Sequence, residues 1–191
     1  MKKSLGAKTL GAVPVWVVGS YDHAGKPNVM TVAWAGICCS KPPCITISLR
    51  KATYTYGSIV ARKAFTVSVP SEAHVKEADY FGLVSGKTVD KFAVSGLTPV
   101  KSDLVDAPYV AEFPLVIECK LLHSFDIGLH TMFVGEIMDV KAEQDVLGAD
   151  GSLDVQKMNP IILGAGSMQY LKLGGVIGQA FEVGRGEGKS G

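Results

Sequence analysis

Three of the four cysteines lie in one stretch, WAGICCSKPPC, from Trp34 to Cys44. Cys38 and Cys39 are neighbours, and neighbouring residues of an extended chain point to opposite faces, so one metal ion could not easily bind both. The spacing also lacks the paired C-x-x-C units of a zinc site. We therefore predict no metal and interpret the cysteines as small buried hydrophobic residues, while a redox role for one thiol stays open.

A second candidate is the stretch SLRKATYTY, from Ser48 to Tyr56. A strand is expected to end at Leu49, two cations follow at Arg50 and Lys51, and a helix is expected to begin near Thr53. Cations and hydroxyls beside a helix N-terminus are suited to a phosphate group. The alternative is an ordinary solvated basic pair before a capped helix.

Two further features stay open on the residues alone. The segment NVMTVAWAG, Asn28–Gly36, places small residues around Trp34, which could line a flat ring system or simply pack as a strand. His130 opens a strand with Met132 and Val134 on the same face. A histidine on an apolar face can be a functional group or a satisfied core residue.

The elements that would position these residues are mostly strands. Alternating or β-branched runs predict strands at 13–19, 28–35, 44–49, 65–69, 115–125 and 131–140. Helices are expected at 53–63 and at 71–81, the second ended by Gly82, and residues 96–114 read as a long loop. This order predicts a mainly β fold, an antiparallel barrel with short helices at its rim. No G-x-G-x-x-G lies between an expected strand and an expected helix, so a Rossmann nucleotide site is not expected, and Walker A and G-x-S-x-G motifs are absent from the sequence.

Composition limits the class of protein. The 191 residues, 47% hydrophobic and 19% charged, predict one domain over residues 1–183, followed by a flexible Gly-rich tail over 184–191. A net charge of +1 gives no broad attraction for nucleic acid or anionic lipid. No apolar run is long enough to cross a bilayer and no signal-peptide pattern follows Met1, so we expect a cytoplasmic protein. The high apolar content favours an oligomer interface.

Taken together, four segments resemble a known family. They are NVMTVAWAGICCSKPPCITISLRKATYTYGSI, ARKAFTVSVPS, DKFAVSGLTPV and LHTMFVGEI. In this order and spacing they are similar to the flavin reductase-like family with an FMN-binding split β-barrel, and within it to the flavoredoxin type. The resemblance runs from about Ala7 to about Phe181.

The resemblance implies a six-stranded antiparallel Greek-key split barrel that forms a homodimer and binds FMN. It implies that the flavin is contacted by Asn28, Met30, Thr31, Ala33, Trp34, Ala35, Cys38, Cys39, Ser40, Arg50, Lys51, Ala52, Thr53, Lys87, Lys91 and Phe92. Within this set, Cys38–Ser40 would form a turn at the ring edge and Arg50–Thr53 the phosphate-binding turn. His130 matches a histidine on the nicotinamide side of the flavin.

The function implied is that of an FMN-containing oxidoreductase that accepts electrons, from NAD(P)H or from a redox protein, and passes them to a partner. Two alternatives remain: an NAD(P)H:flavin reductase that supplies free reduced flavin to a partner enzyme, and a flavin-binding module without catalytic activity. No motif in the sequence identifies the donor or the acceptor.

Overall fold

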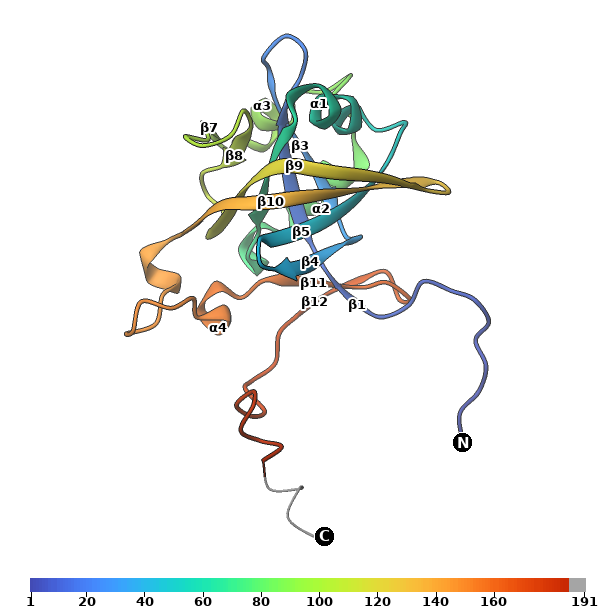
Figure 1. The fold of residues 1–191 in the computed structure, drawn as a ribbon, viewed down its shortest axis with the longest axis vertical. Coiled ribbons are helices and arrows are strands. Elements are labelled where there is room, and N and C mark those ends of the chain that lie inside the picture. The colour runs from blue at the N-terminus through green and yellow to red at the C-terminus, as the bar shows by residue number, and fades with distance from the viewer. Residues whose placement is uncertain (186–191) are drawn as a thin grey trace.

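The centre of the fold is a seven-stranded antiparallel sheet, seen in a computed structural model that describes residues 1–185 (Figure 1). In chain order its strands are β2 (Trp16–Tyr21), β3 (Pro27–Val32), β4 (Ala35–Ser40), β5 (Pro43–Arg50), β6 (Ala64–Val69), β9 (Leu115–Ile127) and β10 (His130–Ala142). Across the sheet the order is β3-β2-β6-β9-β10-β5-β4. The two edge strands, β3 and β4, are therefore consecutive in the chain. Because only Ala33 and Trp34 join them, the sheet closes into a barrel, and the predicted antiparallel split-barrel class is confirmed.

Strand β4 corrects the sequence interpretation in two ways. The segment Asn28–Ala35 was expected to be one strand followed by a turn at Cys38–Ser40, but β3 ends at Val32 and Cys38–Ser40 continue a strand. β4 pairs with β5 as far as Ser40 and Pro43, so the reversal lies at Lys41–Pro42. Since a proline fixes its own φ and has no backbone N–H to donate, the Pro-Pro pair sets the place of the turn. The barrel sheet thus has seven strands where six were expected.

The barrel interior holds the main hydrophobic core. On β5, Ile45, Ile47 and Leu49 are fully buried while the residues between them are only partly covered, which confirms the predicted alternation. The ring of Phe65 lies against Gly135, where a Cβ atom would come within 2.5 Å of it. A glycine on β10 is therefore needed for this ring to fit.

Strand β6 is buried on both faces, because the segment predicted as a long loop covers its outer face. This segment forms two short paired strands, β7 (Pro99–Lys101) and β8 (Pro108–Val110). The hydroxyl of Thr66 donates to the carbonyl of Pro108 at 2.5 Å, and the hydroxyl of Ser68 accepts from the amide of Val110 at 3.2 Å. These bonds satisfy polar side chains that would otherwise be buried at a cost.

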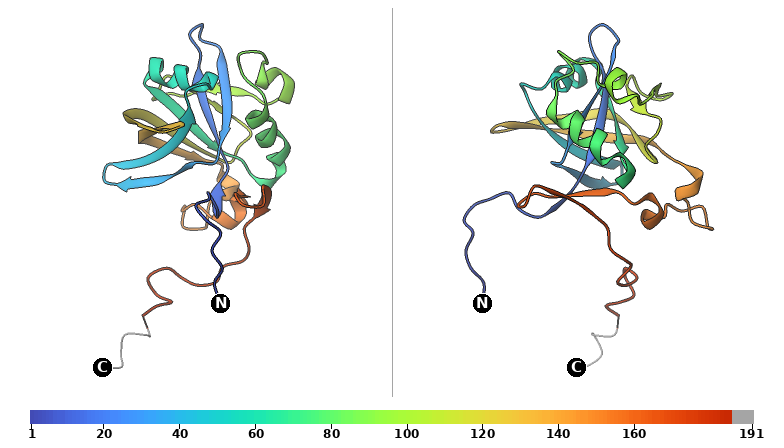
Figure 2. Two further views of the ribbon diagram at one scale, coloured as in Figure 1. Left: turned by 90° about the vertical axis from the view of Figure 1, so that its right-hand side faces the viewer. Right: turned by 180° about the vertical axis from the view of Figure 1, so that it is seen from behind.

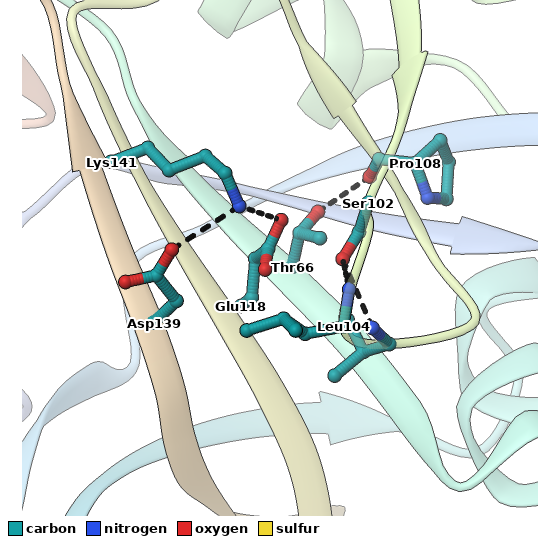
Figure 3. A network of polar contacts seen from close by, with 8 residues as sticks. Thr66, Ser102, Leu104, Pro108, Glu118, Asp139 and Lys141 are labelled. Carbon is teal, nitrogen blue, oxygen red and sulfur yellow. Dashed lines mark hydrogen bonds and ion pairs between the residues drawn. The ribbon is translucent and has the colours of Figure 1, made fainter.

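A buried carboxylate lies on the same outer face (Figure 3). Glu118 of β9 has no exposed surface, and one of its oxygens accepts from the ammonium of Lys141 on β10 at 2.6 Å. Lys141 also pairs with Asp139 at 3.3 Å. A buried charge without its partner is strongly destabilising, so this ion pair ties the two long strands together on the side away from the barrel interior.

Four helices surround the barrel: α1 (Tyr54–Arg62), α2 (Val75–Leu83), α3 (Lys91–Ser95) and α4 (Val155–Met158). The expected helix at 53–63 is close to α1. The second expected helix is shifted, since a 3-10 turn at Glu72–His74 precedes α2 and the helix continues through Gly82. α3 was not predicted, and the carboxylate of its N-cap, Asp90, accepts from the amide of Ala93 at 3.1 Å. α2 and α3 share a second hydrophobic core with β2 and β3.

A small sheet lies at one end of the barrel, and both chain ends leave from that end (Figures 1 and 2). Its strands are β1 (Ala12–Pro14), β11 (Ile161–Gly164) and β12 (Gln169–Lys172), in the order β1-β11-β12. Within residues 1–185, no helix is both long and apolar enough to cross a membrane. The single domain over 1–183 stays a prediction, and the predicted tail lies outside the described residues except for Gly184 and Arg185.

Candidate functional site

Two adjoining cavities meet at the N-terminal end of α1. The first, which we name the β3 cavity, has a volume of about 310 Å³ and is lined by Met30, Arg50, Ala52, Thr53, Tyr54, Thr55, Gly82, Leu83, Val84, Ser85, Gly86 and Lys91. The second, the α1 cavity, has about 430 Å³ and is lined by Asp22, His23, Lys51, Ala52, Thr53, Tyr54, Tyr56, Gly57, Ser58, Ala61, Ser85 and Lys87. Four residues line both: Ala52, Thr53, Tyr54 and Ser85.

The junction of the two cavities is an open helix N-terminus. Thr53 is the N-cap of α1 and has extended backbone geometry, but its side chain accepts no bond from the first turn. Its hydroxyl instead donates to the carbonyl of Arg50 at 2.8 Å, which fixes the turn between β5 and α1. The first turn of α1 contains no acidic residue. Its backbone N–H groups and the positive end of the helix dipole are therefore available to an anion.

The two cations of this turn differ in their surroundings. Lys51 donates to the carboxylate of Asp126 at 2.6 Å, and the hydroxyl of Thr131 donates to the other oxygen of that carboxylate at 2.6 Å. The hydrogen bond to Asp126 raises the pKa of Lys51, and Lys51 and Thr131 together lower the pKa of Asp126. Arg50 forms no ion pair with an acidic side chain of residues 1–185. Its guanidinium is thus the cation with no competing partner at the junction.

A buried lysine forms part of the β3 cavity wall. Lys91 is 4% exposed, and its ammonium donates to the carbonyl of Phe81 at 2.7 Å. Burial away from water disfavours the charged form and lowers the pKa of Lys91 to about 8. No carboxylate of the described chain pairs with it. The wall therefore carries a charge that an anionic ligand group would stabilise.

Asn28 and Gly86 form a tight contact beside the same cavity. The amide nitrogen of Asn28 donates to the hydroxyl of Thr55 at 2.9 Å, while its buried oxygen has no partner within residues 1–185. A Cβ atom on Gly86 would lie 1.9 Å from that oxygen and 3.0 Å from the ring of Tyr54. Only glycine fits here without displacing Asn28.

The remaining predicted contacts do not line either cavity. The hydroxyl of Thr31 donates to the carbonyl of Ala78, and Phe92 is packed in the second core. Ala33, Trp34 and Ala35 lie where β3 crosses into β4. His130 is the residue opposite Arg50 on the β5–β10 ladder and is not part of either cavity wall. Cys38, Cys39 and Ser40 are exposed on β4.

The cysteines differ from the sequence interpretation. All four are free thiols; Cys44 and Cys119 are buried as expected, but Cys38 and Cys39 are exposed. Burial raises the pKa of Cys44 and of Cys119, so neither is a reactive thiolate. Cys44 lies six residues from Arg50 along β5, about 20 Å at the rise of a strand. Among the described residues, no group of three His, Cys, Asp or Glu side chains could hold a metal ion.

Several cavity residues were not singled out from the sequence. Tyr54 carries no motif and Gly82 was expected only as the end of a helix, whereas Thr55 lies within the stretch Ser48–Tyr56, for which a phosphate site was predicted. The segment VSGKT, Val84–Thr88, did offer a signal, because a glycine between a serine and a lysine is a common composition for a loop that contacts phosphate. Of these, only Lys87 was predicted.

Comparison with known proteins identifies the class. Residues 11–168 match the flavin reductase like domain, and the chain belongs to this family. The fold is therefore that of a flavin reductase-like split barrel.

Within and beyond this family, individual proteins can be compared with the chain by sequence identity and by structure. The chain is similar to the flavoredoxin of Desulfovibrio vulgaris (Miyazaki F), with 54% identity, a TM-score of 0.93 and coverage of 97% of this chain and 100% of that one. It is also similar to the flavoredoxin from Methanosarcina acetivorans, with 28% identity, a TM-score of 0.90 and coverage of 97% and 99%. A high molecular weight rubredoxin of Moorella thermoacetica is 33% identical over 52% of this chain and 43% of its own length. The first curated relatives are matched over about half to two thirds of their length.

The contact between Gly86 and Asn28 gives a direct test of the β3 cavity. Gly86→Ala should weaken flavin binding by about tenfold or more, because the added Cβ forces Asn28 or the 84–88 loop to move. Gly57→Ala is the matched control, since a Cβ at that position meets no atom within 4 Å. Flavin titration of both variants would measure this, and equal affinities would show that the ligand does not depend on this wall.

Proposed function

We propose that the protein is an FMN-binding oxidoreductase of the flavoredoxin type, which accepts electrons at bound FMN and passes them to a partner. Family membership and the 54% identity to a flavoredoxin support the class. The observation that carries the proposal is the open N-terminus of α1 next to Arg50, in the wall of a cavity that also contains Met30 of the edge strand β3.

The residues present fit the phosphate end of FMN. The first-turn amides of α1 lack a side-chain acceptor, so an anion would satisfy them. Arg50 would pair with two phosphate oxygens through its planar guanidinium, and Lys51 would add a point charge held in place by Asp126. The hydroxyl of Thr53 would keep the turn in shape through its bond to Arg50.

The β3 cavity fits the rest of the cofactor. β3 is an edge strand, so one set of its backbone N–H and C=O groups has no ladder partner and can bind the polar edge of a ring. The unpartnered oxygen of Asn28 and the buried ammonium of Lys91 supply one acceptor and one charged donor. Met30 would contribute an apolar surface, and Trp34 would help to keep water from the ring. FMN, when bound, supplies the redox chemistry, and the protein holds and tunes it.

A second candidate is an NAD(P)H:flavin reductase that releases its flavin to a partner enzyme. Exposure at the cavity mouth favours it, since Leu83 is 74% exposed and Arg50 and Ala52 also face solvent. In both candidates His130 would act on the nicotinamide side. The donor could be NAD(P)H or a redox protein, and the similarity to a protein described as a rubredoxin supports a protein partner.

The visible spectrum of the purified protein tests the proposal. We expect a bound-flavin spectrum that bleaches on anaerobic addition of NADH or NADPH, or of a reduced redox protein. Arg50→Ala should weaken FMN binding by about tenfold to a hundredfold, because it removes a charge-assisted phosphate contact. Lys101→Ala, an exposed cation on β7, is the control.

The outcomes separate the candidates. A protein that stays colourless with excess FMN, and whose heat stability FMN does not change, is neither a flavoprotein nor a flavin reductase. Flavin lost on dialysis, with NADH oxidation that requires added free flavin, identifies the exchanging reductase. Bound flavin that reduces but passes electrons to no acceptor identifies a binding module.

The lowered pKa of Lys91 gives a prediction of how FMN binding depends on pH. Its pKa is about 8 in the ligand-free protein, and a flavin oxygen that accepts from the ammonium would raise it, so binding takes up a proton above pH 8. The Kd for FMN should therefore be constant near pH 7 and rise by about tenfold per unit above pH 8. Lys91→Met should remove this rise while Lys87→Met keeps it. A Kd that is flat to pH 9 in the wild type would show that Lys91 does not sense the ligand.

A homodimer is the second part of the proposal. The β9–β10 hairpin extends beyond the barrel (Figure 1), and Phe125, Ile127 and Leu129 near its tip are 51%, 57% and 65% exposed. Such grouped apolar residues mark a protein contact, and a second copy satisfies it by symmetry. Sedimentation should give twice the 20.2 kDa chain mass, and Ile127→Glu should give monomers. Val94→Glu, at an equally exposed position on α3, should leave the dimer intact; a wild-type monomer would refute the proposal.

A further inference from the structure

We propose that Cys39 and Cys44 form a thiol–disulfide site, whose two thiols are oxidised to a reversible intramolecular disulfide by exchange with a small-molecule disulfide. The site lies on the β4–β5 hairpin. Neither cysteine lines the cavities at the N-terminal end of α1, so the inference does not depend on the proposed flavin function.

The strand pairing places the two cysteines directly opposite each other, since Cys39 of β4 is in register with Cys44 of β5. Opposed residues of an antiparallel pair point to the same face, with Cα atoms about 4.5–5.5 Å apart and Cβ atoms at a similar separation. A disulfide needs Cα atoms about 4.4–6.8 Å and Cβ atoms about 3.5–4.5 Å apart. The bridge therefore requires the side chains to approach by about 1 Å, a movement open to β4 because it is an edge strand.

The surroundings of the two thiols give them different roles. Cys39 lies on the edge strand and is exposed, so its sulfur is accessible to a small disulfide in solution. Cys44 is 3% exposed, because β5 has a strand on each side, with Cys39 opposite on β4 and Glu136 opposite on β10. Burial, and then the nearby Cys38 and Cys39, raise the pKa of Cys44. Cys39 is thus the thiol that reacts with the oxidant, and Cys44 is the thiol that resolves the product.

The exchange has two steps. The thiolate of Cys39 attacks one sulfur of a disulfide RSSR, which forms a mixed disulfide and releases one RS⁻ that takes up a proton. The Cys44 sulfur then attacks the Cys39 sulfur, and the Cys44 proton passes to the second leaving RS⁻. In total, two cysteine thiols are oxidised to one disulfide and one RSSR is reduced to two RSH.

The hairpin favours this pair over the other cysteines. Only Lys41 and Pro42 connect β4 to β5, so each thiol is at a high effective concentration near the other. Cys38 is the extra residue of the bulge, whereas Cys39 is the one in register with Cys44. Cys119 lies on β9, two strands from β5, which separates it from Cys44 by about 10 Å and places it beyond bridging distance.

Thiol counting tests the inference. The purified protein is incubated with glutathione disulfide in the absence of oxygen, then unfolded in acid, and its free thiols are counted by alkylation and mass spectrometry. We expect the wild type to lose two of its four thiols without a glutathione adduct, and to regain them with excess dithiothreitol. Cys44→Ala should stop at a glutathione adduct on Cys39. Cys39→Ser should form no intramolecular disulfide, whereas the matched control Cys38→Ser, its exposed neighbour, should still lose two thiols.

Three results would overturn the inference. The first is a wild type that keeps all four thiols or stops at a glutathione adduct. The second is a loss of two thiols that Cys38→Ser abolishes, because the bridge would then include Cys38. The third is a disulfide-linked dimer on a non-reducing gel, which would place the bridge between two copies of the chain. Because Cys39 is exposed, Cys39→Ser should fold like the wild type, and its circular dichroism spectrum checks this.

Discussion

Closure of the barrel depends on the crossing between β3 and β4, where the amide of Ser48 donates to the carbonyl of Trp34 at 2.8 Å. The two strands are the opposite edges of one sheet, yet only two residues join them. This crossing brings Met30 of β3 to the same cavity as Arg50 at the end of β5. Residues that are far apart across the sheet thereby become neighbours, and β3 has no second strand partner at its outer edge.

The outer face of the barrel and the cavities differ in how their charged side chains are paired. On the outer face covered by β7 and β8, the buried carboxylate of Glu118 is matched by Lys141. At the cavities the described cations outnumber their partners: Arg50 and Lys91 form no ion pair, and only Lys51 has one, with Asp126. Since a buried ammonium with one carbonyl partner is costly, the β3 cavity keeps a cation that stability alone would not select. A net charge near neutrality conceals this local imbalance.

Whether a feature could be predicted depends on how far apart in the sequence the residues that determine it lie. The alternation on β5 and the helix after Thr53 depend on local patterns, so they could be predicted. The cavity residues Gly86 and Tyr54 could not, because Gly86 lies against Asn28 of another strand and Tyr54 donates to Asp22 in the turn after β2. α3 was missed because five residues are too few for a periodic pattern, although Asp90 is a good N-cap. β4 was misjudged because its small residues resemble a turn, whereas pairing with β5 makes them a strand.

At the cysteines, a β-bulge interrupts the alternation of side chains that is expected along a regular strand. Neighbours on a regular strand face opposite sides, but the β4–β5 register shifts between Ile37 and Cys39, so Cys38 is an extra residue and two cysteines oppose Cys44. Burial, and then the nearby Cys38 and Cys39, raise the pKa of Cys44. Cys38 and Cys39 are nevertheless exposed, whereas the Cys44 thiol is buried and stays protonated. Their position at the far end of β5 from Arg50 separates them from the phosphate turn. The bulge is therefore a feature of the edge strand β4, separate from the cavities at the N-terminal end of α1.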